Sequence, residues 1–163
     1  MRALMVPSYM DDPRGRQAAG ARIRARWVAK YWEGCDLYDG TQRLPDYDAV
    51  IWQKCYYLDH WRAWAAELRE RGVTQALDLC DPVWLQGGAR QLREMLPLMD
   101  FAVAPTEAIR EYLGRTLPAY VIPDRMDLEA QPERKVFGDQ GEDAPAHAVW
   151  FGLSANYEAV TEF

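Results

Sequence analysis

Three segments within residues 47–79 decide the expected fold: YDAVIWQ at 47–53, DHWRAWAAELRER at 59–71 and QALDL at 75–79. The first and third are rich in β-branched, aromatic and aliphatic residues, which is typical of buried strands. The middle segment has helical spacing, with Asp59 as its candidate N-cap and Gly72 as its stop. A strand, a helix and a second strand of these lengths predict one βαβ unit of a parallel sheet.

The same alternation continues on both sides of this unit. Further strands are expected at 3–6, 35–38, 101–104 and 120–122, and further helices at 20–32, 89–96 and 106–113. The residues expected to form the apolar face of the first helix are Ile23, Trp27, Val28 and Tyr31. The expected fold is therefore α/β: a Rossmann-like parallel sheet with helices on both faces, followed by a short βα tail.

The tail predicts a second domain. AVWFG at 148–152 has the composition of a buried strand, and YEAVTEF at 157–163 that of an amphipathic helix. Because one βα unit has no sheet to join, we interpret it as the start of a truncated domain. The expected division is a Rossmann-like domain at 1–128, a polar linker at 129–146 and the start of the second domain at 147–163. Self-association through this apolar tail is a further expectation.

Composition favours a cytoplasmic α/β protein. The 163 residues, 49% of them apolar, suffice for one domain core and an extension. Cys35, Cys55 and Cys80 form no CxxC motif and are expected to be reduced core thiols. With only His60 and His147 as imidazole ligands, no metal site is expected. No apolar run approaches the roughly 18 residues of a membrane span and no signal peptide is recognised, so no integral membrane segment is expected.

Charge is unevenly distributed along the chain. The net charge is −6, but residues 1–32 contain seven Arg and Lys against two Asp, so this segment carries +5 and the rest −11. An acidic protein repels nucleic acid as a whole. We therefore expect no nucleic-acid partner, and interpret the basic segment as a site for a small anionic ligand.

The loop after the first strand, at 7–19, is long enough to be a binding loop. GRQAAG at 15–20 resembles a phosphate loop, but Ala21 and Arg22 replace the Lys and Ser/Thr of that motif, and no GxGxxG is present, so no nucleotide cofactor is expected. Gly20 and Arg22 remain candidates for binding an anionic or carbonyl-rich ligand at a helix start. The alternative is that Arg22, Arg24 and Arg26 form a solvated face or pair with surface carboxylates.

A second candidate loop is LDLCDPVW at 77–84. Asp81 follows the strand, where a carboxylate can accept hydrogen bonds from hydroxyls or act as a base, and Trp84 can support a sugar ring. Alternatively, Asp81 is a turn or cap residue before Pro82. Thr106, after the next strand, either contacts a ligand or caps the helix that it precedes.

Five segments together resemble the N-terminal domain of a GT-B glycosyltransferase followed by the first strand and loop of its C-terminal domain. In chain order they are GARIRARWVAKYW (20–32), LDLCDPVWL (77–85), MDFAVAPTEAIREYLGR (99–115), AYVIPDRMDLE (119–129) and VWFGLSANYEAV (149–160). The resemblance implies an enzyme that moves a sugar from a nucleotide diphosphate donor to an acceptor hydroxyl.

The resemblance also implies roles for individual residues. Asp81 is the expected catalytic residue, and no metal or cofactor is implied. The expected acceptor-binding residues are Gly20, Arg22, Trp84 and Thr106, and the expected donor-binding residues are Gly152, Ser154 and Asn156. Because most of the donor-binding domain is missing, the chain alone is expected to be inactive. Many retaining members have His where this chain has Cys80 and Asp81, so either stereochemical outcome stays open. The alternative from another class is a non-catalytic, flavodoxin-like binding or regulatory module.

Overall fold

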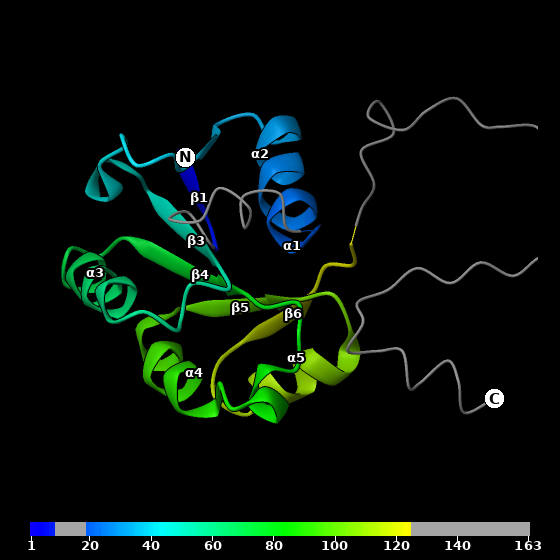
Figure 1. Cartoon of the computed structure of the whole chain (residues 1–163). Helices are drawn as coiled ribbons and strands as arrows, with labels where there is room; N and C mark the ends of the chain where they lie inside the picture. Colours follow the sequence, from blue (N-terminus) through cyan, green and yellow to red (C-terminus); the bar gives the residue numbers. More distant parts are fainter. Residues whose placement is uncertain (9–18, 125–163) are drawn as a thin grey trace, which may run out of the picture. The chain divides into compact units, whose positions relative to one another are not determined.

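Six parallel strands form the sheet of this protein, in the order β2-β1-β3-β4-β5-β6 (Figure 1). The computed structural model describes residues 1–8 and 19–124, all within one compact unit. The strands are β1 (Ala3–Pro7), β2 (Cys35–Leu37), β3 (Ala49–Gln53), β4 (Thr74–Asp78), β5 (Phe101–Ala104) and β6 (Ala119–Val121). The predicted α/β class and parallel sheet are confirmed.

Helices connect these strands close to the predicted positions. They are α1 (Ala19–Ala21), the π-helix η2 (Arg22–Arg26), α2 (Trp27–Tyr31), α3 (Asp59–Glu70), α4 (Ala89–Met95) and α5 (Glu107–Leu113), with 3-10 turns η3 (Leu44–Asp46), η4 (Val83–Gln86) and η5 (Leu96–Leu98). α1, η2 and α2 follow one another directly and form one helical segment over 19–31. Gly72 has a φ of 73° after α3, so the predicted helix stop is confirmed.

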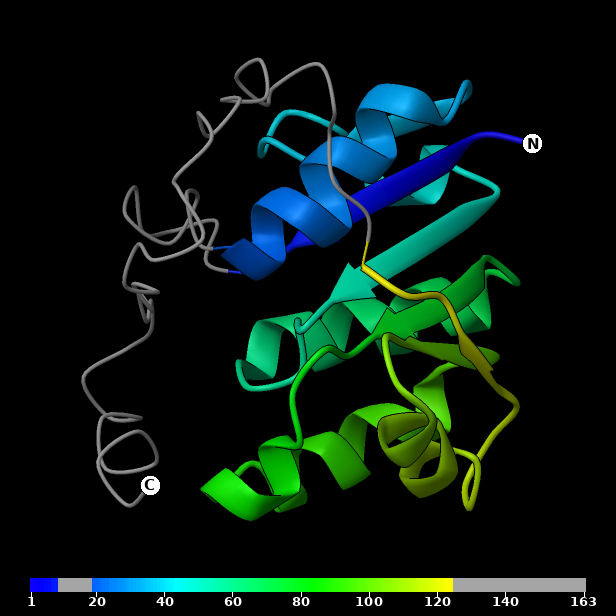
Figure 2. The same ribbon diagram turned by 90° about the vertical axis from the view of Figure 1, so that its right-hand side faces the viewer.

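The strand order reverses its direction at β1, which is one strand from the β2 edge of the sheet. It steps from β1 outward to β2, then crosses to β3 on the other side of β1 and continues through β4 and β5 to β6. Right-handed crossovers in opposite directions place helices on opposite faces. Figure 2 shows the 19–31 segment on one face and α3, α4 and α5 on the other. The predicted covering of both faces is confirmed.

The larger core lies between the sheet and α3, α4 and α5. It includes Trp52 from β3 and Leu68 from α3, both buried. The Gln75 amide in this core is satisfied: the Trp52 indole N–H donates to Gln75 Oε1 at 3.0 Å, and Gln75 Nε2 donates to the Ala65 carbonyl at 2.8 Å. The Trp61 indole N–H, also buried in this core, has no partner within the described residues. Buried amides that are fully hydrogen-bonded cost little and restrict the packing to one arrangement.

The smaller core lies under the 19–31 segment and corrects one prediction. The residues that turn to the sheet are Ala21, Arg24 and Ala25, whereas Val28 and Tyr31 of the predicted apolar face are 37% and 55% exposed. The π-helical turn η2 has more residues per turn than an α-helix and shifts the face that contacts the sheet. Small side chains meet on both sides of this contact, since the strand residues beneath the segment include Ala3, Ala49 and Ala76. The helical segment can therefore lie close to the sheet.

The helix ends also correct one assignment. Leu58, not Asp59, is the N-cap residue of α3, and no side chain caps this end. Asp59 lies in the first turn and forms an ion pair with Arg62, where its negative charge suits the helix dipole.

The predicted linker at 129–146 and the second domain at 147–163 lie outside the described residues. Within the part of the chain that the structure describes, none of the helices has the length and apolar character needed to cross a membrane.

The packing of α3 can be tested by truncating Leu68, which is 1% exposed. Leu68→Ala is expected to lower the free energy of unfolding by about 2–5 kcal/mol, because it leaves a cavity in the larger core. Leu85, which is 76% exposed, provides the control, and Leu85→Ala should change stability by less than about 0.5 kcal/mol. Both are measured by denaturant unfolding. Equal effects of the two substitutions would contradict the described core.

Candidate functional site

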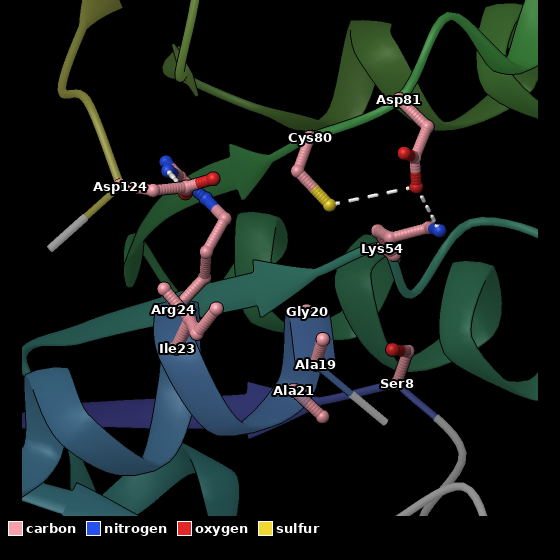
Figure 3. A pocket seen from close by; sticks show the side chains of 10 residues that line it. All are labelled: Ser8, Ala19, Gly20, Ala21, Ile23, Arg24, Lys54, Cys80, Asp81 and Asp124. Carbon is pink, nitrogen blue, oxygen red and sulfur yellow. Dashed lines mark hydrogen bonds and ion pairs between the residues drawn. The ribbon is translucent and has the colours of Figure 1, made fainter. Parts of the chain in front are cut away.

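A cavity of about 210 Å³, lined by both polar and apolar residues, opens at the carboxyl ends of the strands, at the reversal point between β1 and β3 (Figure 3). Ligands of doubly wound α/β proteins bind at this position, because the loops on either side diverge there. The lining residues are Ser8, Ala19, Gly20, Ala21, Ile23, Arg24, Lys54, Cys80, Asp81 and Asp124. They come from the ends of β1, β3, β4 and β6 and from the start of the 19–31 segment.

Ser8 lines the cavity and is held in place by Gln53, which is buried behind it. Both Ser8 N–H and Ser8 Oγ donate to Gln53 Oε1, at 3.2 and 2.9 Å. Gln53 Nε2 lies 4.0 Å from Cys80 Sγ. A Cβ atom at Gly20 would lie 3.5 Å from both Cys80 Sγ and Gln53 Nε2, which is ordinary van der Waals contact. Gly20 therefore leaves room in the cavity, and alanine there would occupy part of it without a clash.

Arg24 joins three elements at one wall of the cavity. Its side chain is 5% exposed; Nε donates to Asp78 Oδ1 at 2.7 Å, and Nη1 donates to Asp124 Oδ1 at 2.7 Å and to the Ile122 carbonyl at 3.1 Å. Burial opposes the guanidinium charge, but Asp78 and Asp124 outweigh it and raise the pKa of Arg24. Burial raises the pKa of Asp78 to about 6, against the opposing effect of Arg24.

Lys54 and Asp81 form the opposite wall. Lys54 Nζ pairs with Asp81 Oδ2, and Cys80 Sγ donates to the same oxygen at 3.5 Å (Figure 3). Lys54 has a φ of 56°, a left-handed conformation that costs a non-glycine residue about 1 kcal/mol or more. Its N–H donates to the Asp78 carbonyl at 2.9 Å, which holds this conformation. Strain of this kind is typical of residues that a functional site requires.

The Cys80 thiol is not poised as a nucleophile. Burial, followed by the nearby Asp81 carboxylate, raises the pKa of Cys80 to about 12, so the thiol stays protonated near neutral pH. Cys35 and Cys55 are free thiols as well, and burial raises the pKa of each. The cysteines therefore contribute packing rather than reactivity.

Two of the predicted site residues, Gly20 and Asp81, line the same cavity. The backbone of Asp81 takes part in a turn, because its carbonyl accepts a hydrogen bond from Val83 N–H at 2.8 Å. Its side chain does not cap η4, whose N-cap residue is Pro82. The carboxylate is 44% exposed and directed to Lys54, so it is accessible to a ligand.

The other predicted acceptor residues lie elsewhere in the described structure. Arg22 is exposed, with its guanidinium 5.5 Å from the Trp27 ring centroid. Trp84 stacks on Tyr112 with 3.7 Å between ring centroids. Thr106 caps α5, since its Oγ1 accepts from Ile109 N–H at 3.4 Å. Their acceptor roles stay predictions. Gly152, Ser154 and Asn156 lie outside the described residues.

Sequence reasoning missed Lys54, Arg24, Ser8 and Asp124 as members of this site. Lys54 had a usable signal, because it directly follows the strand at 47–53 and the strand-end rule that selected Asp81 applies to it equally. No sequence signal distinguishes Arg24, because its neighbours in the same helical segment are exposed cations of the same kind.

The charges of this cavity are largely matched. Arg24 is paired with Asp78 and Asp124, and Lys54 with Asp81. Among the residues that line the cavity, the two carboxylates of Asp81 and Asp124 balance the two cations, so the described lining carries no excess positive charge when all are ionised. Such a site favours a ligand that offers hydroxyl groups over a phosphate. Within residues 1–8 and 19–124, no cluster of three or more His, Cys, Asp or Glu side chains is arranged to hold a metal ion.

Comparisons with protein-family models, with curated proteins and with solved structures found no match to this chain. The chemistry of the site therefore stands on the residues described above.

The role of Arg24 can be tested by Arg24→Met, which leaves the buried Asp78 carboxylate without its nearest cation. At pH 8 we expect a loss of about 3–5 kcal/mol in the free energy of unfolding. The pKa of Asp78 is about 6 in the folded chain against an ordinary value of 3.8, and removing Arg24 raises the folded value further. Because a raised carboxyl pKa lowers stability as pH rises, the loss should be smaller at pH 5 than at pH 8.

Arg26→Met is the matched control, because Arg26 is an exposed arginine of the same helical segment. It should change stability by less than about 0.5 kcal/mol at both pH values. A loss for Arg24→Met that is the same at pH 5 and pH 8 would argue against a charged Asp78 as its partner.

Proposed function

We propose that this chain forms the acceptor side of a GT-B-type glycosyltransferase, which moves a sugar from a nucleotide diphosphate donor to an acceptor hydroxyl. The observation that carries the proposal is the accessible Asp81 carboxylate, which is held by Lys54 and lines the cavity at the reversal point of the sheet. The acceptor hydroxyl would bind in this cavity, beside Asp81.

In the proposed reaction, Asp81 accepts a hydrogen bond from the acceptor hydroxyl and takes its proton. The acceptor oxygen forms a bond to the anomeric carbon of the donor sugar. The bond from that carbon to the diphosphate oxygen breaks, and its electron pair leaves with the diphosphate. Lys54 acts as a positioning residue, since its ion pair orients the Asp81 carboxylate.

The convergence of three resembling segments supports this proposal. Gly20 belongs to the first segment, Asp81 to the second and Asp124 to the fourth, and all three line one cavity although they lie far apart in the sequence. Residues that serve one ligand must meet in space, and these residues do.

The remaining assignments follow the same proposal. Arg22, Trp84 and Thr106 would contact more distant parts of the acceptor, and the residues after 147 would contact the donor. We place the protein in the cytoplasm, because Cys35, Cys55 and Cys80 are all free thiols, which suits a reducing compartment.

The role of Asp81 can be tested by Asp81→Asn, in a protein that carries this chain together with a donor-binding domain. Transfer from a panel of nucleotide sugars, followed by release of nucleotide, should show a fall in kcat/KM of at least about tenfold, or roughly 1.4 kcal/mol. The unfolding midpoint should change little, because Asp81 is partly exposed.

Asp59→Asn provides the control, since Asp59 is an exposed carboxylate that also pairs with a cation of its own region. It should leave kcat/KM unchanged. If Asp81→Asn lowers the unfolding midpoint and leaves kcat/KM unchanged, Asp81 is a structural residue and the proposed reaction loses its base.

A second candidate, the flavodoxin-like binding module, is favoured by the strand order. β2-β1-β3-β4-β5 is the order of the flavodoxin-like doubly wound sheet, in which the ligand binds at the β1/β3 reversal point. Titration of the chain with flavin mononucleotide, monitored by quenching of flavin fluorescence, separates the two candidates. Saturable quenching at one flavin per chain would favour the module, whereas no quenching favours the transferase.

A further inference from the structure

The outer side of the helical segment 19–31 combines exposed cations with exposed apolar side chains. We call these residues the basic-aromatic face: Arg22, Arg26, Val28, Lys30, Tyr31 and Trp32. Val28, Tyr31 and Trp32 have the i, i+3, i+4 spacing of one helix flank, and Arg26 and Lys30 the i, i+4 spacing of the other. Since Ala25 and Ala29 of the same segment pack in the smaller core against the sheet, both flanks are directed outward.

The apolar content of this face is unusual for the surface of this protein. Among the described residues, seven large hydrophobic side chains are exposed, and Val28, Tyr31 and Trp32 are three of them. Met1, which is 83% exposed, is a fourth, and it lies beside the turn after α2, where Ala3 N–H donates to the Gly34 carbonyl at 2.8 Å. Exposed apolar residues that gather in one place mark an interaction surface.

The charge of this face also differs from that of the other helices. Exposed arginines on α3, α4 and α5 pair with glutamates of the same helix, as in Arg71–Glu67, Arg90–Glu94 and Arg110–Glu107. The 19–31 segment contains no Asp or Glu at all. The segment itself is therefore purely basic, although the rest of the chain is acidic.

We propose that the basic-aromatic face binds the surface of an anionic lipid bilayer. Helices that lie in the membrane interface place apolar and aromatic residues among the acyl chains and Lys or Arg at the headgroups. Tyr and Trp suit this boundary, since each has an apolar ring and a polar group. A single-stranded nucleic acid would also meet cations and rings, but it has no use for the aliphatic Val28, whereas a bilayer accepts this side chain together with the aromatic rings and cations.

The position of this face leaves the cavity open. The 19–31 segment begins at the cavity, with Gly20, and ends at the opposite edge of the sheet, near the start of β1 (Figure 2). A bilayer in contact with Tyr31 and Trp32 would therefore lie away from Asp81. This inference does not depend on the proposed transferase activity.

The test is sedimentation of the chain with large vesicles of phosphatidylcholine and phosphatidylglycerol in a 3:1 ratio, compared with vesicles of phosphatidylcholine alone. We expect binding to the anionic vesicles only. Binding should weaken when the salt concentration is raised from 0.1 to 0.5 M, because the screening length falls from roughly 10 Å to about half of that.

Two double substitutions remove the cations and the apolar side chains in turn, although Tyr31→Ser also removes the ring over which Lys30 Nζ lies at 4.7 Å. Arg26→Gln with Lys30→Gln should weaken binding by at least about tenfold, since each cation near an anionic surface contributes roughly fivefold. Val28→Ser with Tyr31→Ser should also weaken vesicle binding by about tenfold, because these side chains would no longer insert among the acyl chains. The matched controls are Arg90→Gln with Arg115→Gln, and Leu85→Ser, which change exposed residues elsewhere and should bind as the unmodified chain does.

Equal binding by the flank variants and the controls would overturn the proposal, as would sedimentation with neutral vesicles alone. Binding of single-stranded oligonucleotide, with no binding to anionic vesicles, would also overturn it and assign the face to nucleic acid. If vesicles are not bound and the chain self-associates until Val28 and Tyr31 are replaced, the face joins copies of this chain instead. Circular dichroism of each variant verifies that the fold is retained.

Discussion

The buried guanidinium of Arg24 is the interaction on which the arrangement of this domain depends. A charge that is 5% exposed is tolerated only when it is paired and hydrogen-bonded, so Arg24 requires Asp78, Asp124 and the Ile122 carbonyl in place around it. These partners come from the end of β4 and from the chain after β6. The 19–31 segment can therefore dock on the sheet only where both carboxylates meet its arginine.

The cavity follows from this docking. Once Arg24 fixes the start of the helical segment beside β4, Gly20 lies close to Cys80 and Gln53, and a space remains between the segment and Lys54. The left-handed backbone of Lys54 is part of the same geometry. Its N–H binds the carbonyl of Asp78, whose side chain binds Arg24, so one residue connects both walls of the site. The site is preorganised by the ion pairs that also hold the domain together.

The sequence predicted the sheet well because parallel strands buried on both faces are nearly continuous apolar runs, as YDAVIWQ and QALDL are. The strand-end rule then selected Asp81. The contacts that the site residues make with one another could not be predicted in this way, because they join segments that are far apart in the sequence. Arg24 and Asp124 are 100 residues apart, and Gln53 meets Asp78 only through the register of β3 and β4. Helical periodicity also failed over 19–31, because the π-helical turn changes the face that contacts the sheet.

The described cations of residues 1–32 do not form one site in the structure. A sequence reading assigns all of these cations to one anionic ligand, but the structure separates them by direction. Arg24 turns inward and is neutralised by two carboxylates, whereas Arg22, Arg26 and Lys30 are exposed. Of these four cations, only Arg24 lines the cavity. The charges of the described cavity lining are thus balanced, and the positive surface lies on the outer side of the same helical segment. The 19–31 segment therefore supplies both a buried, neutralised arginine and an exposed positive surface, and the two can interact with different partners.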